Sequence, residues 1–143
     1  MQSQDTPIHQ HYSDGDVIIN EGETGNNAYV IIKGQVRITQ KVNEKVVTVG
    51  TLKEREVFGE MGLISETVRS ANISAVGDVT VGVIDREHFD TAMSEISEGM
   101  KPIILTLVER LRSTTHLLTR ISLELENTKE NISSILSGKS EQE

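Results

Sequence analysis

The segment from Gly15 to Asp85 alternates short apolar runs with glycine, asparagine and charged residues, a pattern typical of strands joined by turns. The runs are rich in Val, Ile and Thr, whose branched side chains favour extended backbone. They predict strands at Val17–Ile19, Ala28–Ile32, Gln35–Lys41, Val46–Thr51, Asn72–Val76 and Thr80–Ile84. The spacing of runs and turns predicts a sandwich or a jelly-roll barrel.

The periodicity then changes from strand-like to helical. Asp85 is a suitable helix cap, and Arg86–Ile96 carries apolar residues at helical spacing. Gly99 and Pro102 mark a break, after which neither proline nor glycine interrupts the chain until about Leu136. The sequence therefore predicts a mainly β fold with C-terminal helices, one short and one long.

The long helix has a heptad pattern. One lane holds an apolar residue at every seventh position, and a mixed lane runs beside it. The first lane is Leu111, Leu118, Leu125 and Ile132, and the second is Ile104, Val108, Thr115, Ser122, Lys129 and Leu136. Such a pattern is typical of a coiled coil. At 1.5 Å per residue the helix is about 50 Å long, too long for one small barrel to cover. We therefore expect a parallel homodimer formed through residues 104–136.

These patterns divide the chain into four parts. We expect a flexible lead-in over residues 1–11, a β-barrel over 12–99, the long helix over 100–136 and a disordered tail over 137–143. The length of 143 residues suits one such domain.

Composition restricts the partners. The formal net charge of −8 argues against a nucleic-acid surface, and no apolar run is long enough to span a membrane. The chain has no cysteine and no visible signal peptide, which favours a cytoplasmic protein. His9 and His11 form a His-x-His pair, but a metal site needs three or four converging ligands. We expect no metal and no cofactor.

One stretch, Phe58 to Ile64 followed by Arg69-Ser70-Ala71, has the chemistry of a phosphate and sugar site. Gly59 has no Cβ and lets backbone approach a ligand, and the first N–H groups of a short helix near Glu60 favour an anion. Arg69 offers a planar fork of donors that matches a phosphate. Glu60 would repel the phosphate, so we expect it to accept hydrogen bonds from sugar hydroxyls. The alternative is that Glu60 only favours the helix dipole.

This stretch resembles the phosphate-binding cassette of cyclic nucleotide-binding domains, as in catabolite activators and protein kinase A regulatory subunits. The upstream segment from Gly15 to Val36 resembles the first strands of the same family, so the resemblance covers about residues 12–118. Gly62 stands where the family often has alanine, and Val68 where it often has proline. No helix-turn-helix segment follows the long helix, so we do not expect a complete transcription factor.

The resemblance implies a set of ligand-binding residues. The ribose and phosphate would be surrounded by Gly59, Glu60, Met61, Arg69, Ser70 and Ala71. The base would pack against Ile38 and Val49. The alternative for these two is that they are ordinary inward-facing strand residues. From the long helix, Arg110, Thr114 and Thr115 would contact the base, the alternative being that the threonines are seam spacers. The ligand would be cAMP in preference to cGMP.

The expected function is a cyclic nucleotide sensor, not an enzyme, that transmits ligand binding through its C-terminal helix to a downstream protein that the motifs do not identify. One alternative is a dimeric coiled-coil scaffold with a non-binding jelly roll. Another is a small cupin-type metalloenzyme, which the histidine pattern disfavours.

Overall fold

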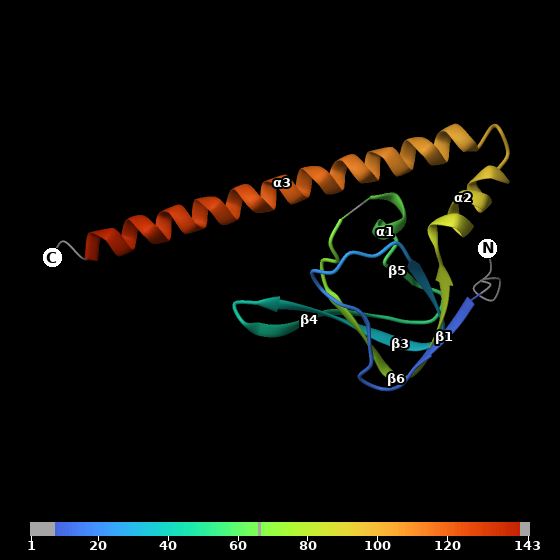
Figure 1. The fold of residues 1–143 in the computed structure, drawn as a ribbon, viewed down its shortest axis with the longest axis horizontal. Coiled ribbons are helices and arrows are strands. Elements are labelled where there is room, and N and C mark those ends of the chain that lie inside the picture. Colours follow the sequence, from blue (N-terminus) through green and yellow to red (C-terminus); the bar gives the residue numbers. More distant parts are fainter. Residues whose placement is uncertain (1–7, 66, 141–143) are drawn as a thin grey trace. The chain divides into compact units, whose positions relative to one another are not determined.

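The computed structural model describes residues 8–65 and 67–140. The described chain consists of a curled β-sheet, a one-turn helix between two of its strands, and two C-terminal helices (Figure 1). The elements are β1 Ile8–Tyr12, β2 Val17–Ile19, β3 Ala28–Val42, β4 Lys45–Leu52, β5 Val57–Phe58, α1 Met61–Ile64, β6 Asn72–Ile84, α2 Arg86–Ser94 and α3 Lys101–Ser140.

Two long antiparallel strands, β3 and β6, form the centre of the sheet. They pair from Ala28 opposite Ile84 to Thr39 opposite Asn72. The strand order is β1-β6-β3-β4, with β2 also paired to β6 and β5 to β3. Each long strand therefore has more than one partner along its length, which is how a single sheet rolls up around a core, as in the expected jelly roll.

The core lies inside this rolled sheet. Its members are apolar residues from β2, β3, β5 and β6, namely Ile19, Ile31, Val36, Phe58, Ile73, Ala75, Val79 and Val81. The rings of Tyr29 and Phe58 stack beside it with centroids 5.1 Å apart. Burying such side chains stabilises the fold by about 1.5–3 kcal/mol for each large residue. β5, which supplies Phe58, is thereby fixed immediately before the cassette.

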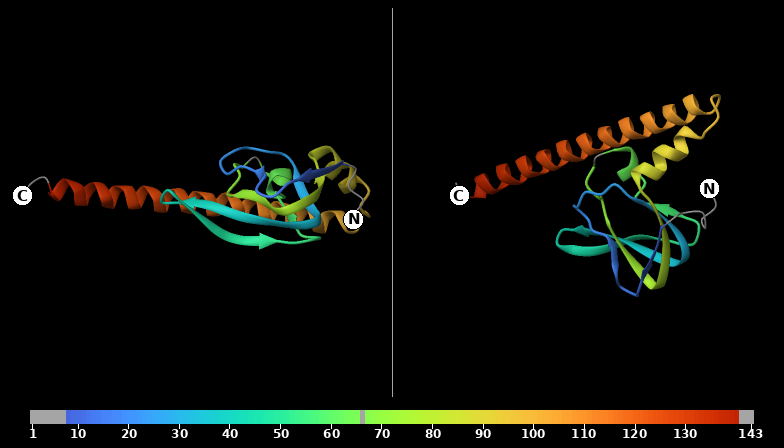
Figure 2. Two further views of the ribbon diagram at one scale, coloured as in Figure 1. Left: turned by 90° about the horizontal axis from the view of Figure 1, so that it is seen from below. Right: turned by 45° about the vertical axis from the view of Figure 1, so that its right-hand side comes forward.

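The β3–β4 hairpin projects from the body of the sheet (Figures 1 and 2). Its loop consists of Asn43 and Glu44, whose φ angles of 49° and 66° are those of a two-residue hairpin turn that matches the twist of the strands. On β4 the pairing passes from Gly50 opposite Ile38 to Thr48 opposite Thr39, so Val49 is the extra residue of a β-bulge.

Three boundary predictions are wrong. Two pairs of predicted strands are continuous in the structure, because Gly34 and Gly77 lie within β3 and β6 rather than in turns. β1 begins at Ile8 and pairs with β6, so the part of the expected lead-in from Ile8 to His11 is a strand. Residues 1–7 lie outside the described residues.

The chain divides into two compact units, Met1–Ser97 and Glu98–Glu143, close to the expected boundary after residue 99. The second unit contains α3, which continues to Ser140, so the part of the expected disordered tail from 137 to 140 is helical. Residues 141–143 lie outside the described residues. None of the described helices is both long and apolar enough to cross a membrane.

Candidate functional site

The cassette adopts the turn and single helical turn that its sequence predicts. Gly59 has a φ of +75°, a conformation that residues with a side chain rarely adopt. A Cβ there would also lie 3.0 Å from Ile19 Cδ1 and 3.1 Å from the Asn27 carbonyl oxygen. Glu60 then occupies the N-cap position of α1 without a side-chain cap hydrogen bond. Glycine at position 59 is therefore required both by the backbone angle and by close packing.

Arg69 connects the cassette to the β2–β3 connection, residues 20–27. Its Nη1 donates to the Gly59 carbonyl at 2.9 Å, and its Nη2 donates to the Asn27 carbonyl at 2.8 Å. Its backbone N–H donates to the Glu23 carbonyl, and its own carbonyl accepts from the Gly22 N–H. The guanidinium is thus held by backbone from two sides.

A guanidinium carries five N–H groups, and these two bonds use two of them. Within the described part of the chain the other three have no hydrogen-bond acceptor. Arg69 is partly buried, so an anion that met these donors would be partly shielded from water. The arrangement can therefore bind a phosphate without releasing the carbonyls that hold the side chain.

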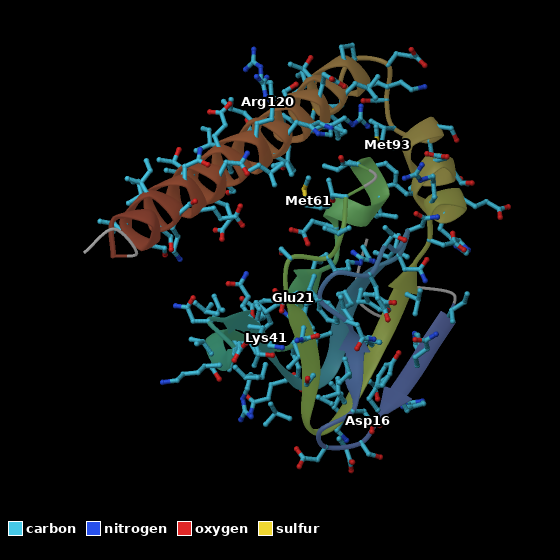
Figure 3. The ribbon with its side chains drawn as sticks, turned by 60° about the vertical axis from the view of Figure 1, so that its left-hand side comes forward. Asp16, Glu21, Lys41, Met61, Met93 and Arg120 are labelled. Atoms are coloured by element: carbon cyan, nitrogen blue, oxygen red, sulfur yellow. The ribbon has the colours of Figure 1, made fainter. Side chains whose placement is uncertain are left out.

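A second polar network links β3 to the residues after Arg69. The Gln40 amide donates to the Ser70 carbonyl at 3.0 Å. Asn72 Oδ1 accepts from the Glu21 N–H at 2.8 Å. The Glu21 carboxylate accepts from the backbone N–H of Lys41 at 3.1 Å, and both residues are labelled in Figure 3. Asn72 is therefore committed to the backbone of the β2–β3 connection.

The predicted cassette residues lie in one segment but differ in exposure. Glu60 and Ser70 are exposed, Met61 is partly buried on α1, and Ala71 is buried at the start of β6. Exposed positions suit groups that meet a ligand, whereas the buried Ala71 packs in the protein interior. The ligand roles of these residues stay predictions.

The two predicted wall residues stand differently on the hairpin. Ile38 is partly buried and packs against the core, so it belongs to the inner face of the sheet. Val49 is the bulge residue and is 58% exposed. On β4, Val47 lies on the same face as Ile38, because it pairs with Gln40, two residues along β3; Val47 is itself 45% exposed. The sequence did not point to Val47, since a bulge changes which residues share a face; the wall role of Val49 stays a prediction.

The three predicted base contacts from the helix, Arg110, Thr114 and Thr115, all lie on α3, in the second unit. Thr114 Oγ1 donates to the Arg110 carbonyl one turn earlier, at 2.7 Å. Their contact with a base stays a prediction.

A link from the cassette to α2 was not predicted from the sequence. Arg86, the first residue of α2, extends its Nη2 to the Gly62 carbonyl of α1 at 3.3 Å. Its Nε is buried without a hydrogen-bond partner among the described residues. Asp85 caps the same helix by accepting from the His88 N–H at 2.8 Å, and this hydrogen bond lowers the pKa of the Asp85 carboxyl below its usual value. The cassette and α2 are thus joined by a direct hydrogen bond.

The histidine pair has no site around it. His9 and His11 lie in β1, and the His11 ring contacts the Thr80 hydroxyl. Over residues 8–65 and 67–140 no group of three or more His, Cys, Asp or Glu side chains is placed to hold a metal ion.

Comparison with known proteins agrees with this geometry. Residues 9–95 match the cyclic nucleotide-binding domain family. Mouse cGMP-dependent protein kinase 2 is 36% identical over 137 residues, which cover 86% of this chain and 18% of the kinase. Among solved structures, the EAL enzyme Bd1971 in its cAMP-bound form has a TM-score of 0.59 at 28% identity and covers 78% of this chain and 30% of that one.

The cGMP-bound form of Bd1971 has a TM-score of 0.58 at 30% identity, covering 73% of this chain and 28% of that one. The catabolite activator protein of Thermus thermophilus has a TM-score of 0.62 at 28% identity, covering 80% and 55%. The matched region, the rolled sheet and the cassette define a nucleotide-binding class of fold. This chain belongs to the cyclic nucleotide-binding domain family. It spans less than a fifth of the similar kinase.

Proposed function

We propose that this chain binds a cyclic nucleotide and acts as a cytoplasmic sensor module without catalytic activity of its own. Arg69 contacts the cyclic phosphate, and Glu60 accepts from the ribose 2′-hydroxyl. The observation that carries the proposal is the Arg69 guanidinium, which two backbone carbonyls hold while three of its donors remain available among the described residues. The ligand is cAMP in preference to cGMP, because Arg110, Thr114 and Thr115 resemble the base-contacting stretch of catabolite activators.

We infer that ligand binding is transmitted through the helices. A nucleotide that pulls on Arg69 acts on Gly59 at the start of the cassette, and the Gly62 carbonyl of the same cassette accepts from Arg86 of α2. A ligand shifts such an equilibrium only by its different affinity for two arrangements of these contacts. The contacts supply a continuous path from the phosphate to the helix that precedes α3.

The same proposal includes a parallel homodimer through α3. The leucine lane is exposed, with Leu111 at 46%, Leu118 at 59% and Leu125 at 66%. A second lane lies three residues after the members of the leucine lane. It consists of apolar residues and threonines, so it is more apolar than the mixed lane that contains Ser122 and Lys129. This lane is Thr114, Ile121, Thr128 and Ile135, and Leu107 continues it one heptad earlier.

The two threonines fit an apolar seam because their hydroxyls are already hydrogen-bonded. Thr114 donates to the Arg110 carbonyl and Thr128 donates to the Glu124 carbonyl, at 2.7 and 2.9 Å. Their methyl groups can therefore pack without leaving a polar atom unsatisfied. In this register Glu124 and Lys129 flank the seam and meet across a parallel pair of helices, which favours the parallel orientation.

A thermal-shift series tests the binding proposal. The protein is melted with cAMP, cGMP, 5′-AMP, or divalent metal alone, since a ligand that binds only the folded state raises the melting temperature. We expect a rise of several degrees with the cyclic nucleotides, larger with cAMP, and none with 5′-AMP. A rise with metal alone would support a metalloenzyme instead, and no rise with any ligand would support a non-binding scaffold.

A further inference from the structure

The Arg69 guanidinium lies between two glycines from different segments. A Cβ on Gly25, in the β2–β3 connection, would lie 2.8 Å from Nη2 and 3.1 Å from Nε. A Cβ on Gly62, in α1, would lie 2.9 Å from Nη1 and 3.1 Å from Nη2. A Cβ essentially never comes within 3.0 Å of a non-bonded heavy atom of a residue beyond its chain neighbours. In this structure the guanidinium fits between the two segments because both positions lack a side chain.

The two glycines also approach each other. A Cβ on Gly62 would lie 2.4 Å from the Gly25 carbonyl oxygen, which is backbone and cannot swing aside as a side chain can. The connection that carries Gly25 is fixed by a β-bridge between Thr24 and Val68 and by the hydrogen bond from Arg69 to the Asn27 carbonyl. In this chain a side chain at position 62 would therefore force α1 or this connection to move, although the family often has alanine at this position.

Glycine is a poor residue for a helix, so its presence in the single turn of α1 has a cost for that turn. The close approach of the Gly25 backbone explains why glycine occupies position 62 in spite of this cost. We propose that Gly25 and Gly62 are positioning residues, which leave the space in which Arg69 is oriented before ligand binds. The inference rests on the proposed role of Arg69 in binding the cyclic phosphate. Orienting a binding group in advance raises affinity because less freedom is lost on binding.

Gly25→Ala is the cleaner test, because the three nearest atoms that the new methyl group would meet all belong to the Arg69 guanidinium. The backbone at Gly25 has no left-handed φ, so alanine fits there otherwise. In the ligand-free variant we expect the restrained guanidinium NMR signals of Arg69, assigned by their loss in Arg69→Lys, to disappear. By calorimetry we expect cyclic nucleotide affinity to fall about tenfold, while affinity for the nucleoside without phosphate is unchanged.

Two comparisons separate positioning from general damage. Gly99→Ala adds a methyl group where nothing lies within 4 Å, and should leave the Arg69 signals and the affinity as in the wild type. In the Arg69→Ala background, Gly25→Ala should cause no further loss of affinity, since the group that it displaces is gone.

Gly62→Ala gives a second, independent readout. Alanine is the better helix former, yet we expect a lower melting temperature and loss of the Arg69 signals, because the Gly25 backbone must move. Gly138→Ala, in α3 with nothing within 4 Å, should not lower the melting temperature.

The outcomes distinguish this inference from the proposed function. Unchanged Arg69 signals in both Gly25→Ala and Gly62→Ala would overturn the positioning role even if the wild type binds cyclic nucleotide. Loss of those signals in a protein that binds no cyclic nucleotide would support the positioning of Arg69 and reject its ligand.

Discussion

At the scale of single residues, the site depends on backbone atoms as much as on side chains. Arg69 is held by the carbonyls of Gly59 and Asn27. The sequence shows the arginine and the glycines, because their chemistry is specific to the residue type. It does not show the Asn27 carbonyl, since every residue has one. The candidate site could therefore be predicted to the level of its ligand-facing groups but not of the atoms that orient them.

Glu60 provides the first prediction at this scale. Glu60→Gln replaces a charge-assisted hydrogen bond to the 2′-hydroxyl by a neutral one, a difference of about 1 kcal/mol. We expect affinity for cAMP to fall about fivefold and affinity for 2′-deoxy-cAMP to stay the same, measured by calorimetry. Glu95→Gln, at an exposed position after α2, is the control. Equal losses for both ligands would remove the ribose role of Glu60.

Val47 and Val49 provide the second. Val47 shares a face of the hairpin with Ile38 and is 45% exposed, whereas Val49 is the bulge residue and is 58% exposed. Removing two methyl groups from a contact with the ligand costs about 1 kcal/mol when the contact is partly covered. We expect Val47→Ala to lower nucleotide affinity about three- to tenfold and Val49→Ala to change it less than twofold. A larger loss of affinity for Val49→Ala than for Val47→Ala would assign the contact with the base to Val49 instead.

At the scale of elements, each predicted strand and helix is confirmed as to type. Several of the predicted ends and connecting turns are wrong. Gly34 and Gly77 are turn formers by type, yet each is absorbed in a long strand with a positive φ. Local composition cannot tell a bulge from a turn, because the difference lies in the pairing with a distant strand. β1 was missed for the same reason, since the polar run His9 to His11 is a strand only through its pairing with β6.

The cap of α2 gives a prediction on pH. The His88 N–H lowers the pKa of Asp85 in the folded state, so the stabilisation is present above the unfolded pKa of about 3.9 and is lost as the pH falls through the lower folded value. Asp85→Ala should lower the melting temperature at pH 7, and the difference from wild type should shrink below about pH 4. Thermal melts across this range measure it.

Asp90→Ala is the matched control for the cap, because Asp90 is exposed on the same helix. It should leave the melting temperature nearly unchanged at both pH values. A difference for Asp85→Ala that did not depend on pH would show that its carboxylate charge contributes nothing to the cap.

At the scale of the whole molecule, the chain consists of two compact units. The first contains the rolled sheet, the cassette and α2, and the second contains the 40-residue helix α3. The exposed apolar lanes of α3 leave a large surface that a second copy would cover. The proposed dimer would turn a local change at Arg69 into a change between two chains.

Charge reversal tests the orientation of that dimer. Lys129→Glu would place glutamates opposite each other in a parallel pair, so we expect a weaker dimer by analytical ultracentrifugation. Glu124→Lys should weaken it similarly, and the double variant should restore it. Leu118→Asp, in the apolar lane, should give monomers with helix α3 exposed. A wild type that is monomeric at every concentration would contradict the proposed dimer.

The most direct test of the account is the calorimetric affinity of cyclic nucleotide for the wild type, Arg69→Ala and Arg37→Ala. Arg37 is an exposed arginine of β3 and serves as the matched control. A lost charge-assisted hydrogen bond of about 1.5–3 kcal/mol predicts a tenfold to several hundredfold weaker affinity for Arg69→Ala, with Arg37→Ala unchanged. Equal affinity in all three proteins would contradict the assignment of Arg69 to the phosphate.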